Sequence, residues 1–416
     1  MSISIRARVV FPVDGPPIER GVVTIDDGRI VEVRTHARQA NVIDLASVAL
    51  LPGLVNAHTH LEFSHLRQPL GEPGMVLPNW IRLVIAERGR SGADARIAIG
   101  TGLAESANCG VTTLGDIASG RTDNPVRRSK PDGQDCPSYG GSDRIVFFEV
   151  IGFSRARADS ACVALVERLN AAASDPASRV GISPHAPYTV SPALLRRLIA
   201  ESRQHGLPVA MHLAESREEL AFLKTGAGPL QELLDERSMW DAEAVPHGSR
   251  PLDYLRLLAD APRALVIHGN YLNDEELAFL AGQRERMSLV YCPRTHTYFQ
   301  HEPYPLVAAM MAGVRVALGT DSRASNPDLD LLAEIRFVAR AYPTIDPHDV
   351  LQMGTLTGAE ALGREDEVGS LTPGKLANMV AVPLPEDVRG TPNDLLAAIF
   401  ANGWPVSSVW LRGNEQ

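Results

Sequence analysis

The sequence predicts an α/β fold, a (β/α)8 TIM barrel with a small β-sandwich domain formed by both chain ends. Three observations support this. Eight short apolar runs alternate with amphipathic segments of helix length, β-like segments occur near both ends, and reactive polar residues follow several apolar runs. A doubly wound sheet would instead gather its chemistry near one switch point. We expect the small domain to combine residues 1–52 and 366–416, and the barrel to comprise residues 53–365.

The chain ends are expected to pair as strands of the small domain. In the N-terminal part, β-branched residues alternate or cluster between Asp-Gly turn signals, in the segments 3–10, 21–26 and 29–34. β-like segments return after residue 366, at residues 369–371, 378–382 and 406–412. The simplest assembly joins the two sets in one β module beside the barrel.

Between the two ends, strand and helix patterns alternate from Leu54 onwards. The expected barrel strands are residues 54–58, 111–116, 144–150, 179–184, 208–212, 264–268, 288–292 and 314–319. Helical patterns between them include residues 93–108, 192–205, 274–282 and 329–341. The segment 119–143 is rich in Gly, Pro, Ser and Asp and predicts a long loop on the face where a substrate would enter. The role of this loop stays open.

Composition and charge narrow the function classes. The chain carries a formal net charge of −10 and no long run of Lys or Arg, which argues against nucleic acid and against an anionic membrane as partners. A small-molecule substrate fits better. No apolar stretch reaches membrane-spanning length, and the N-terminal segment lacks the apolar region of a signal peptide. The cysteines are scattered without a CxxC pair, so we expect a cytoplasmic protein without a disulfide framework.

The segment Asn56-Ala57-His58-Thr59-His60 ends the first expected barrel strand. Two histidines at i and i+2 on an extended chain project to the same side, so their imidazoles can meet at one ion. A His-x-His pair alone is a weak signal, because such pairs are often incidental. Its position directly after Pro52-Gly53 and an apolar strand strengthens the metal interpretation.

Three further strand ends carry comparable residues. His212 ends the fifth expected strand, His268 ends the sixth, and Asp321 follows the eighth. In a parallel barrel these ends converge on the carboxyl-terminal face, where barrel enzymes place their active sites. Each histidine taken alone is more often a hydrogen-bonded structural residue than a metal ligand. Independent structural roles do not readily explain why histidine and aspartate occur together at several strand ends in this order.

These motifs together resemble the amidohydrolase superfamily. The resembling residues are Leu51-Pro52-Gly53-Leu54-Val55-Asn56-Ala57-His58-Thr59-His60, then His212, His268, Gly319-Thr320-Asp321-Ser322 and Gly369-Ser370-Leu371-Thr372-Pro373-Gly374-Lys375. Within the superfamily, the pattern is similar to the branch that contains cytosine, guanine, S-adenosylhomocysteine and aminofutalosine deaminases and the triazine chlorohydrolases. The resemblance covers nearly the whole chain.

The resemblance implies one divalent metal ion held by His58, His60, His212 and Asp321. Neutral imidazoles with one carboxylate suit Zn²⁺, which we expect, with Fe²⁺ as the alternative. Binuclear relatives add a carboxylated lysine at the end of the fourth strand. No lysine stands at that strand end in this chain, whose lysines are Lys130, Lys224 and Lys375.

Glu215 follows His212 by three residues, and this His-x-x-Glu spacing resembles the deaminase arrangement. The resemblance implies that Glu215 carries protons to a ring nitrogen of the substrate and that Asp321 accepts a proton from the attacking water. It also implies that His268 orients or polarises this water, from which the metal makes hydroxide available. For Glu215, the structural alternative is a solvated carboxylate at a helix start, stabilised by the helix dipole.

Four further residues are candidates for substrate binding. His185 lies in a His-Ala-Pro-Tyr segment that is similar to a substrate-facing segment of nucleoside-type deaminases. Arg294 follows the seventh strand and would bind a carboxylate or phosphate, with a structural salt bridge as an equal alternative. Trp80 and His65 are candidates for the pocket wall, although packing of their loops explains them equally well.

The resulting prediction is a metal-dependent aminohydrolase that removes the 6-amino group of an adenine nucleoside derivative such as aminofutalosine, adenosine or S-adenosylhomocysteine. The segment 56–64 resembles aminofutalosine deaminases. The same metal site would also serve a guanine, pterin or triazine aminohydrolase or a chlorohydrolase. A non-catalytic barrel scaffold would have lost ligands, whereas every ligand position is filled here, and an amidase is disfavoured by the missing lysine. Barrels of this kind often pair, so we expect a homodimer.

Overall fold

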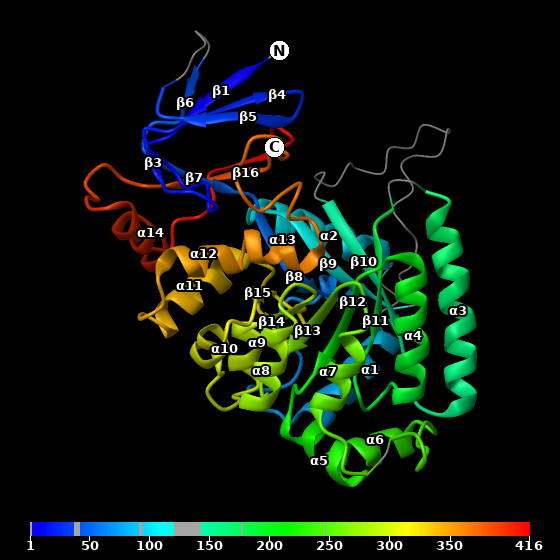
Figure 1. The fold of residues 1–416 in the computed structure, drawn as a ribbon. Coiled ribbons are helices and arrows are strands. Elements are labelled where there is room, and N and C mark those ends of the chain that lie inside the picture. The colour runs from blue at the N-terminus through cyan, green and yellow to red at the C-terminus, as the bar shows by residue number, and fades with distance from the viewer. Residues whose placement is uncertain (1, 37–41, 91–94, 120–142, 176–177, 246) are drawn as a thin grey trace.

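A computed structural model of the chain shows a parallel β-barrel surrounded by helices and a smaller β domain that contains both termini (Figure 1). The structure describes residues 2–36, 42–90, 95–119, 143–175, 178–245 and 247–416. The predicted loop 119–143 therefore lies, except for its two end residues, outside the described residues. The predicted (β/α)8 barrel with a separate small β domain is confirmed. The bounds that we expect for the two domains stay a prediction.

Eight parallel strands follow one another around the barrel in the order of the sequence. They are β8 (Leu54–Thr59), β9 (Val111–Ala118), β10 (Asp143–Val150), β11 (Val180–Pro184), β12 (Val209–Leu213), β13 (Ala264–His268), β14 (Met287–Tyr291) and β15 (Val316–Leu318). A parallel bridge between Thr59 and Asp321 joins the first strand to the residues after the last strand and closes the ring. The strands are buried almost throughout, as expected for parallel strands that helices cover.

Helices cover the outside of the barrel (Figure 1). They are α1 (Leu77–Arg90), α2 (Ala95–Asn108), α3 (Arg155–Ala173), α4 (Pro192–His205), α5 (Arg217–Thr225), α6 (Pro229–Glu236), α7 (Pro251–Leu258), α8 (Asp274–Gly282), α9 (Pro293–Tyr298), α10 (Leu306–Ala312), α11 (Leu331–Ala341) and α12 (Pro347–Met353), with the 3-10 helix η1 (Leu61–Phe63). The helix α13 (Leu356–Leu362) instead adds Ala359, Ala361 and Leu362 to the hydrophobic cluster inside the barrel. Local signals explain α4: the Ser191 side chain caps its start, and Gly206 ends it with a left-handed φ of 66°. No helix in the described part of the chain is long and apolar enough to cross a membrane.

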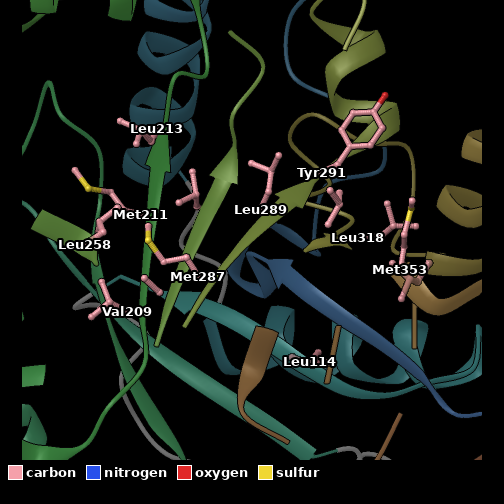
Figure 2. Packing of buried hydrophobic residues seen from close by; sticks show 14 of the residues in the cluster. Leu114, Val209, Met211, Leu213, Leu258, Met287, Leu289, Tyr291, Leu318 and Met353 are labelled. Carbon is pink, nitrogen blue, oxygen red and sulfur yellow. The ribbon is translucent and has the colours of Figure 1, made fainter. Parts of the chain in front are cut away.

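Strand residues alternate between two hydrophobic clusters, as the strand period of two requires. One cluster faces the covering helices and includes Val209, Met211 and Leu213 of β12 with Leu258 of α7 (Figure 2). The other cluster contains the alternate residues, such as Ala210 of β12, and fills the barrel interior. Because the interior is packed, a site for chemistry is expected at the carboxyl-terminal end of the strands.

The small domain consists of a four-stranded sheet of N-terminal strands, in the order β5-β4-β1-β6, and a six-stranded sheet that contains strands from both chain ends. Its strands are β1 (Ile3–Arg6), β2 (Val9–Val10), β3 (Ile18–Glu19), β4 (Val22–Asp26), β5 (Arg29–Arg34), β6 (Val42–Asp44), β7 (Val48–Pro52), β16 (Met379–Pro383), β17 (Ser408–Leu411) and β18 (Asn414–Glu415). The helix α14 (Pro392–Ala401), between β16 and β17, packs against α11 and α12 of the barrel. β7 pairs with both β2 and β16, so N-terminal and C-terminal segments share one sheet. Two predictions were incomplete: α14 was not expected, and residues 369–371 form no strand because Gly369 turns the chain with a φ of 88°.

Candidate active site

The predicted metal ligands meet at the carboxyl-terminal end of the barrel strands. His58 lies in β8, His60 follows it, His212 lies in β12, and Asp321 follows β15. Ligand atoms of His58, His60 and Asp321 lie within 4.8 Å of one another, and so do those of His58, His212 and His268. His60 Nε2 and His212 Nε2 are 3.4 Å apart. All five side chains are buried, which suits a shared cation better than separate solvated groups.

One hydrogen bond determines which nitrogen of His212 carries the proton. Nδ1 lies 3.0 Å from the backbone carbonyl oxygen of His185, which can only accept, so Nδ1 donates and Nε2 presents its lone pair to the cluster. Burial lowers the pKa of His212, and it lowers the pKa of His60 and His268 in the same way. The imidazoles are therefore neutral at pH 7, which is their metal-binding form.

The chemistry of these donors fits a divalent cation. Both ring nitrogens of His58 and Nδ1 of His60 are buried without a hydrogen-bond partner among the described residues. One ion can bind only one nitrogen of each ring. A cation bound at His58 Nε2, which lies 3.5 Å from Asp321 Oδ1, would offset the cost of about 1–3 kcal/mol for leaving that buried nitrogen without a partner. Burial alone would raise the pKa of Asp321, but the imidazoles of His58 and His268 hold it below its ordinary value, so the carboxylate is charged. Neutral nitrogens with one carboxylate oxygen suit Zn²⁺ or Fe²⁺.

Strained backbone occurs at three of the strand ends that carry this chemistry. Ala214, His268 and Asp321 adopt left-handed φ angles of 53°, 68° and 56°. Such residues cost about 1–3 kcal/mol each and cluster at functional sites. At His268 the left-handed φ breaks the strand alternation, which would otherwise place its side chain with Val266 against the helices. The strain thus turns the His268 imidazole towards the other ligands.

Hydrogen bonds hold Asp321 in its strained conformation. Its backbone N–H donates to the carbonyl of His58 over 3.1 Å, and Thr59 Oγ1 donates to its carbonyl over 2.8 Å. Ser325 Oγ donates to Oδ2 over 2.8 Å, while Oδ1 lies 3.5 Å from His58 Nε2. A Cβ on Gly319 would lie 2.9 Å from the His58 Cβ, which explains the glycine in the Gly-Thr-Asp-Ser motif.

Glu215 lies beside the cluster at the turn between β12 and α5. Its Oε1 is 3.6 Å from His268 Nε2, and the side chain is almost completely buried. Burial, together with the charges of Asp321 and Glu219, raises the pKa of Glu215 well above its ordinary value. Glu215 is therefore not a solvated carboxylate at a helix start, and its surroundings favour the protonated form.

A profile of the amidohydrolase family matches residues 49–415. The chain belongs to the amidohydrolase family. The resemblance seen in the strand-end motifs is thereby confirmed, and the match spans the barrel as well as the C-terminal strands of the small domain.

Relatives of this amidohydrolase include several deaminases. The 5-methylthioadenosine/S-adenosylhomocysteine deaminase of Moorella thermoacetica is 30% identical over 99% of this chain and 93% of that protein. The aminodeoxyfutalosine deaminase of Deinococcus radiodurans is 31% identical over 76% of this chain and 74% of that protein. A zinc-bound adenosine deaminase of Xanthomonas campestris has a TM-score of 0.78 at 26% identity, covering 99% of this chain and 92% of that one. The aminofutalosine deaminase of Helicobacter pylori, with a TM-score of 0.84 at 21% identity and 99% coverage of both chains, shares the fold.

Among the predicted substrate contacts, His185 lies beside the metal cluster. Its ring centroid is 5.2 Å from that of His212, and its Nδ1 is 2.7 Å from Thr189 Oγ1. Burial, with a smaller effect of Arg88, lowers the pKa of His185 to about 3, so the ring is neutral. Its role in substrate binding stays a prediction.

Trp80 and His65 contact other parts of the protein. Trp80 Nε1 donates to the carbonyl of Ala324 over 3.1 Å, and its ring packs edge-on against Phe299. His65 Nε2 lies 3.2 Å from Glu87 Oε1. These contacts support the packing alternative for both residues, and their contact with substrate stays a prediction.

Arg294 is engaged in an ion-pair network. Its guanidinium donates to Glu334 over 2.7 Å and to both carboxylate oxygens of Asp328 over 2.6 and 3.1 Å. Glu334 is fully buried. The geometry favours the structural salt bridge over a substrate contact, and the function proposed below does not depend on Arg294.

Replacing Arg294 by methionine is expected to lower the free energy of unfolding by about 3–5 kcal/mol, because buried Glu334 loses its counter-charge. The KM for substrate should stay within about twofold, because the guanidinium is already paired. Chemical denaturation and steady-state kinetics measure the two quantities. A large rise in KM with unchanged stability would instead make Arg294 a substrate contact.

Sequence reasoning missed two residues that hold Glu215. The Glu219 carboxylate accepts the backbone N–H groups of Ala214 and Glu215 over 2.7 and 3.1 Å. Asn270 Nδ2 donates to the carbonyl of Glu215 over 2.9 Å. A signal for Glu219 was present, because Ser216 and Glu219 form the Ser-x-x-Glu pattern of a helix start. The hydrogen bond from Asn270 connects the segments after two different strands, and no local sequence pattern predicts it.

Proposed function

We propose that this amidohydrolase is a metal-dependent deaminase that removes the 6-amino group of an adenine nucleoside derivative of the aminofutalosine, adenosine or S-adenosylhomocysteine type. The observation that carries the proposal is the buried Glu215 carboxylate, with its raised pKa, 3.6 Å from His268 beside the ligand cluster. A carboxyl group that holds a proton near neutral pH is what protonation of a purine ring nitrogen requires. The names of the relatives support the same substrate class.

The metal site is proposed to consist of His58, His60, His212 and Asp321, with His268 at its edge. Zn²⁺ is the proposed ion, with Fe²⁺ as the alternative. When bound, the ion supplies Lewis acidity that lowers the pKa of a water molecule towards neutrality.

The chain's own residues carry the protons in this proposal. As water adds to C6, Asp321 accepts one of its protons and protonated Glu215 donates to the adjacent ring nitrogen N1. His268 Nε2 forms a hydrogen bond with the attacking water and so orients its oxygen towards C6. Asp321 then returns its proton to the exocyclic amino group, the C6–N bond breaks and ammonia leaves. Glu215 recovers a proton from the C6 hydroxyl as the carbonyl forms, so atoms and charges balance.

Ammonia release from a panel of compounds tests this function. The zinc-loaded enzyme should release ammonia from at least one of adenosine, 5′-methylthioadenosine, S-adenosylhomocysteine and aminofutalosine, with kcat/KM at least about a hundredfold above that for guanine and pterins. Release from guanine, pterins or a triazine alone would overturn the substrate class.

The expected homodimer and the cytoplasmic location stay predictions.

A further inference from the structure

The turn that carries Glu215 has all four of its backbone polar groups held. Glu219 accepts the N–H groups of Ala214 and Glu215 over 2.7 and 3.1 Å. The N–H of Tyr271 donates to the carbonyl of Ala214 over 3.1 Å, and Asn270 Nδ2 donates to the carbonyl of Glu215 over 2.9 Å. The turn is thus fixed from α5 on one side and from the segment after His268 on the other.

This turn needs such support because its backbone is strained. Ala214 adopts a φ of 53°, a conformation that costs a residue with a Cβ free energy and persists only where its surroundings enforce it. The two oxygens of Glu219, which is fully buried, face the two N–H groups of the turn. If these bonds were lost, Ala214 would relax towards ordinary backbone angles and Glu215 would turn away from His268.

We propose that Glu219 is a positioning residue for the deamination: it fixes the Glu215 carboxylate against His268 and so sets the geometry of proton transfer. This inference rests on the function proposed above for Glu215. A glutamine at 219 would keep the size of the side chain but present one acceptor and one amide donor to two N–H groups. The donor would oppose one of these N–H groups, and the turn would lose one of the two hydrogen bonds that Glu219 gives it.

The chain offers a matched control in Glu276. This residue is also buried, occupies the third position of α8, and accepts two backbone N–H groups, from Asn273 over 2.9 Å and from Leu252 over 3.2 Å. Its bonds hold a helix start, and they do not include the Glu215 turn. Comparing Glu219→Gln with Glu276→Gln therefore separates the position of the carboxylate from the general cost of losing such a residue.

The first experiment compares the two metal-loaded variants with the wild type. Glu219→Gln should lower kcat at least about tenfold with KM within about threefold. A displacement of the Glu215 carboxylate by about 1 Å is enough to slow the chemical step while substrate binding is kept. It should also speed hydrogen–deuterium exchange at the amides of Ala214 and Glu215 without loss of metal. Glu276→Gln should leave kcat and this exchange unchanged. Equal kcat values in the two variants, or unchanged exchange at the turn, would overturn the proposal.

A double-mutant cycle tests whether Glu219 acts through Glu215. In a Glu215→Gln background, adding Glu219→Gln should change kcat by no more than about twofold, because the group being positioned no longer carries a proton. A full independent decrease would overturn the proposal in favour of a general structural role. If Glu219→Gln fails to fold, Asn270→Ala removes another of the four hydrogen bonds that hold the turn, and the same measurements apply. If the wild type releases no ammonia from any nucleoside, the proposed function fails, and amide exchange still decides whether Glu219 holds the turn.

Discussion

Replacing Glu215 by glutamine is expected to lower kcat for ammonia release by about 10²–10⁴-fold, the range observed when a general acid–base group is lost. Glutamine keeps the size of the side chain and its place 3.6 Å from His268, but it cannot donate a proton to N1. Burial and the charges of Asp321 and Glu219 raise the pKa of Glu215, which favours the protonated form of the native side chain. KM should change little, since the shape of the site is kept.

Steady-state kinetics on the preferred nucleoside, with metal content measured on the same samples, test this expectation. Glu276→Gln is the control, since Glu276 is also buried and lies outside the ligand cluster. A Glu215→Gln enzyme that keeps its metal and works at nearly the wild-type rate would remove Glu215 from proton transfer. In that case the proposed metal site would be unaffected, and another residue would have to act as the general acid.

Removing the metal with a chelator is expected to lower activity at least about 10³-fold, because the Lewis-acid contribution amounts to several kcal/mol. Stability should fall as well. The Nε2 of His58 would be left buried without a partner, and binding of an ion to the folded state alone contributes about 4 kcal/mol at a thousand times its dissociation constant.

Adding back metal ions separates a specific site from unspecific binding. One equivalent of Zn²⁺ per chain should restore activity and melting temperature, whereas Mg²⁺, which prefers oxygen ligands, should restore neither. Asp321→Asn should prevent restoration, because the cluster would lose its only charged donor among the described ligand residues. Two ions per chain, or full activity in a thoroughly chelated sample, would contradict the single-ion site.

Much of the barrel could be predicted because its signals are local. The bounds of β13, α4 and α8 agree with the sequence patterns, since periodicity and capping residues lie within each segment. The meeting of His58, His212 and Asp321 could also be predicted, because parallel strands of a barrel bring their carboxyl ends together.

What could not be predicted depends on contacts across the chain or on backbone angles. The partner of Arg294 is Glu334, which lies 40 residues further along the chain, and no local sequence pattern near either residue predicts this ion pair. The left-handed φ of His268 decides which way its ring points, and the residue type does not reveal it. The helix α14 is a different case, because Thr391 and Asp394 form a capping box that the β-like surroundings obscured.

The ring of strands closes where Thr59 meets Asp321, 262 residues later in the chain. A growing polypeptide leaves the ribosome from its N-terminus, so His58 and His60 emerge long before their carboxylate partner has been translated. Until then the sheet has open edges that invite wrong pairing, and the two histidines have no Asp321 to complete their ligand set. We therefore expect that an ion can meet its full proposed ligand set only after β15 has been translated, and that a translation product that stops before β15 can neither close its barrel nor assemble the full site.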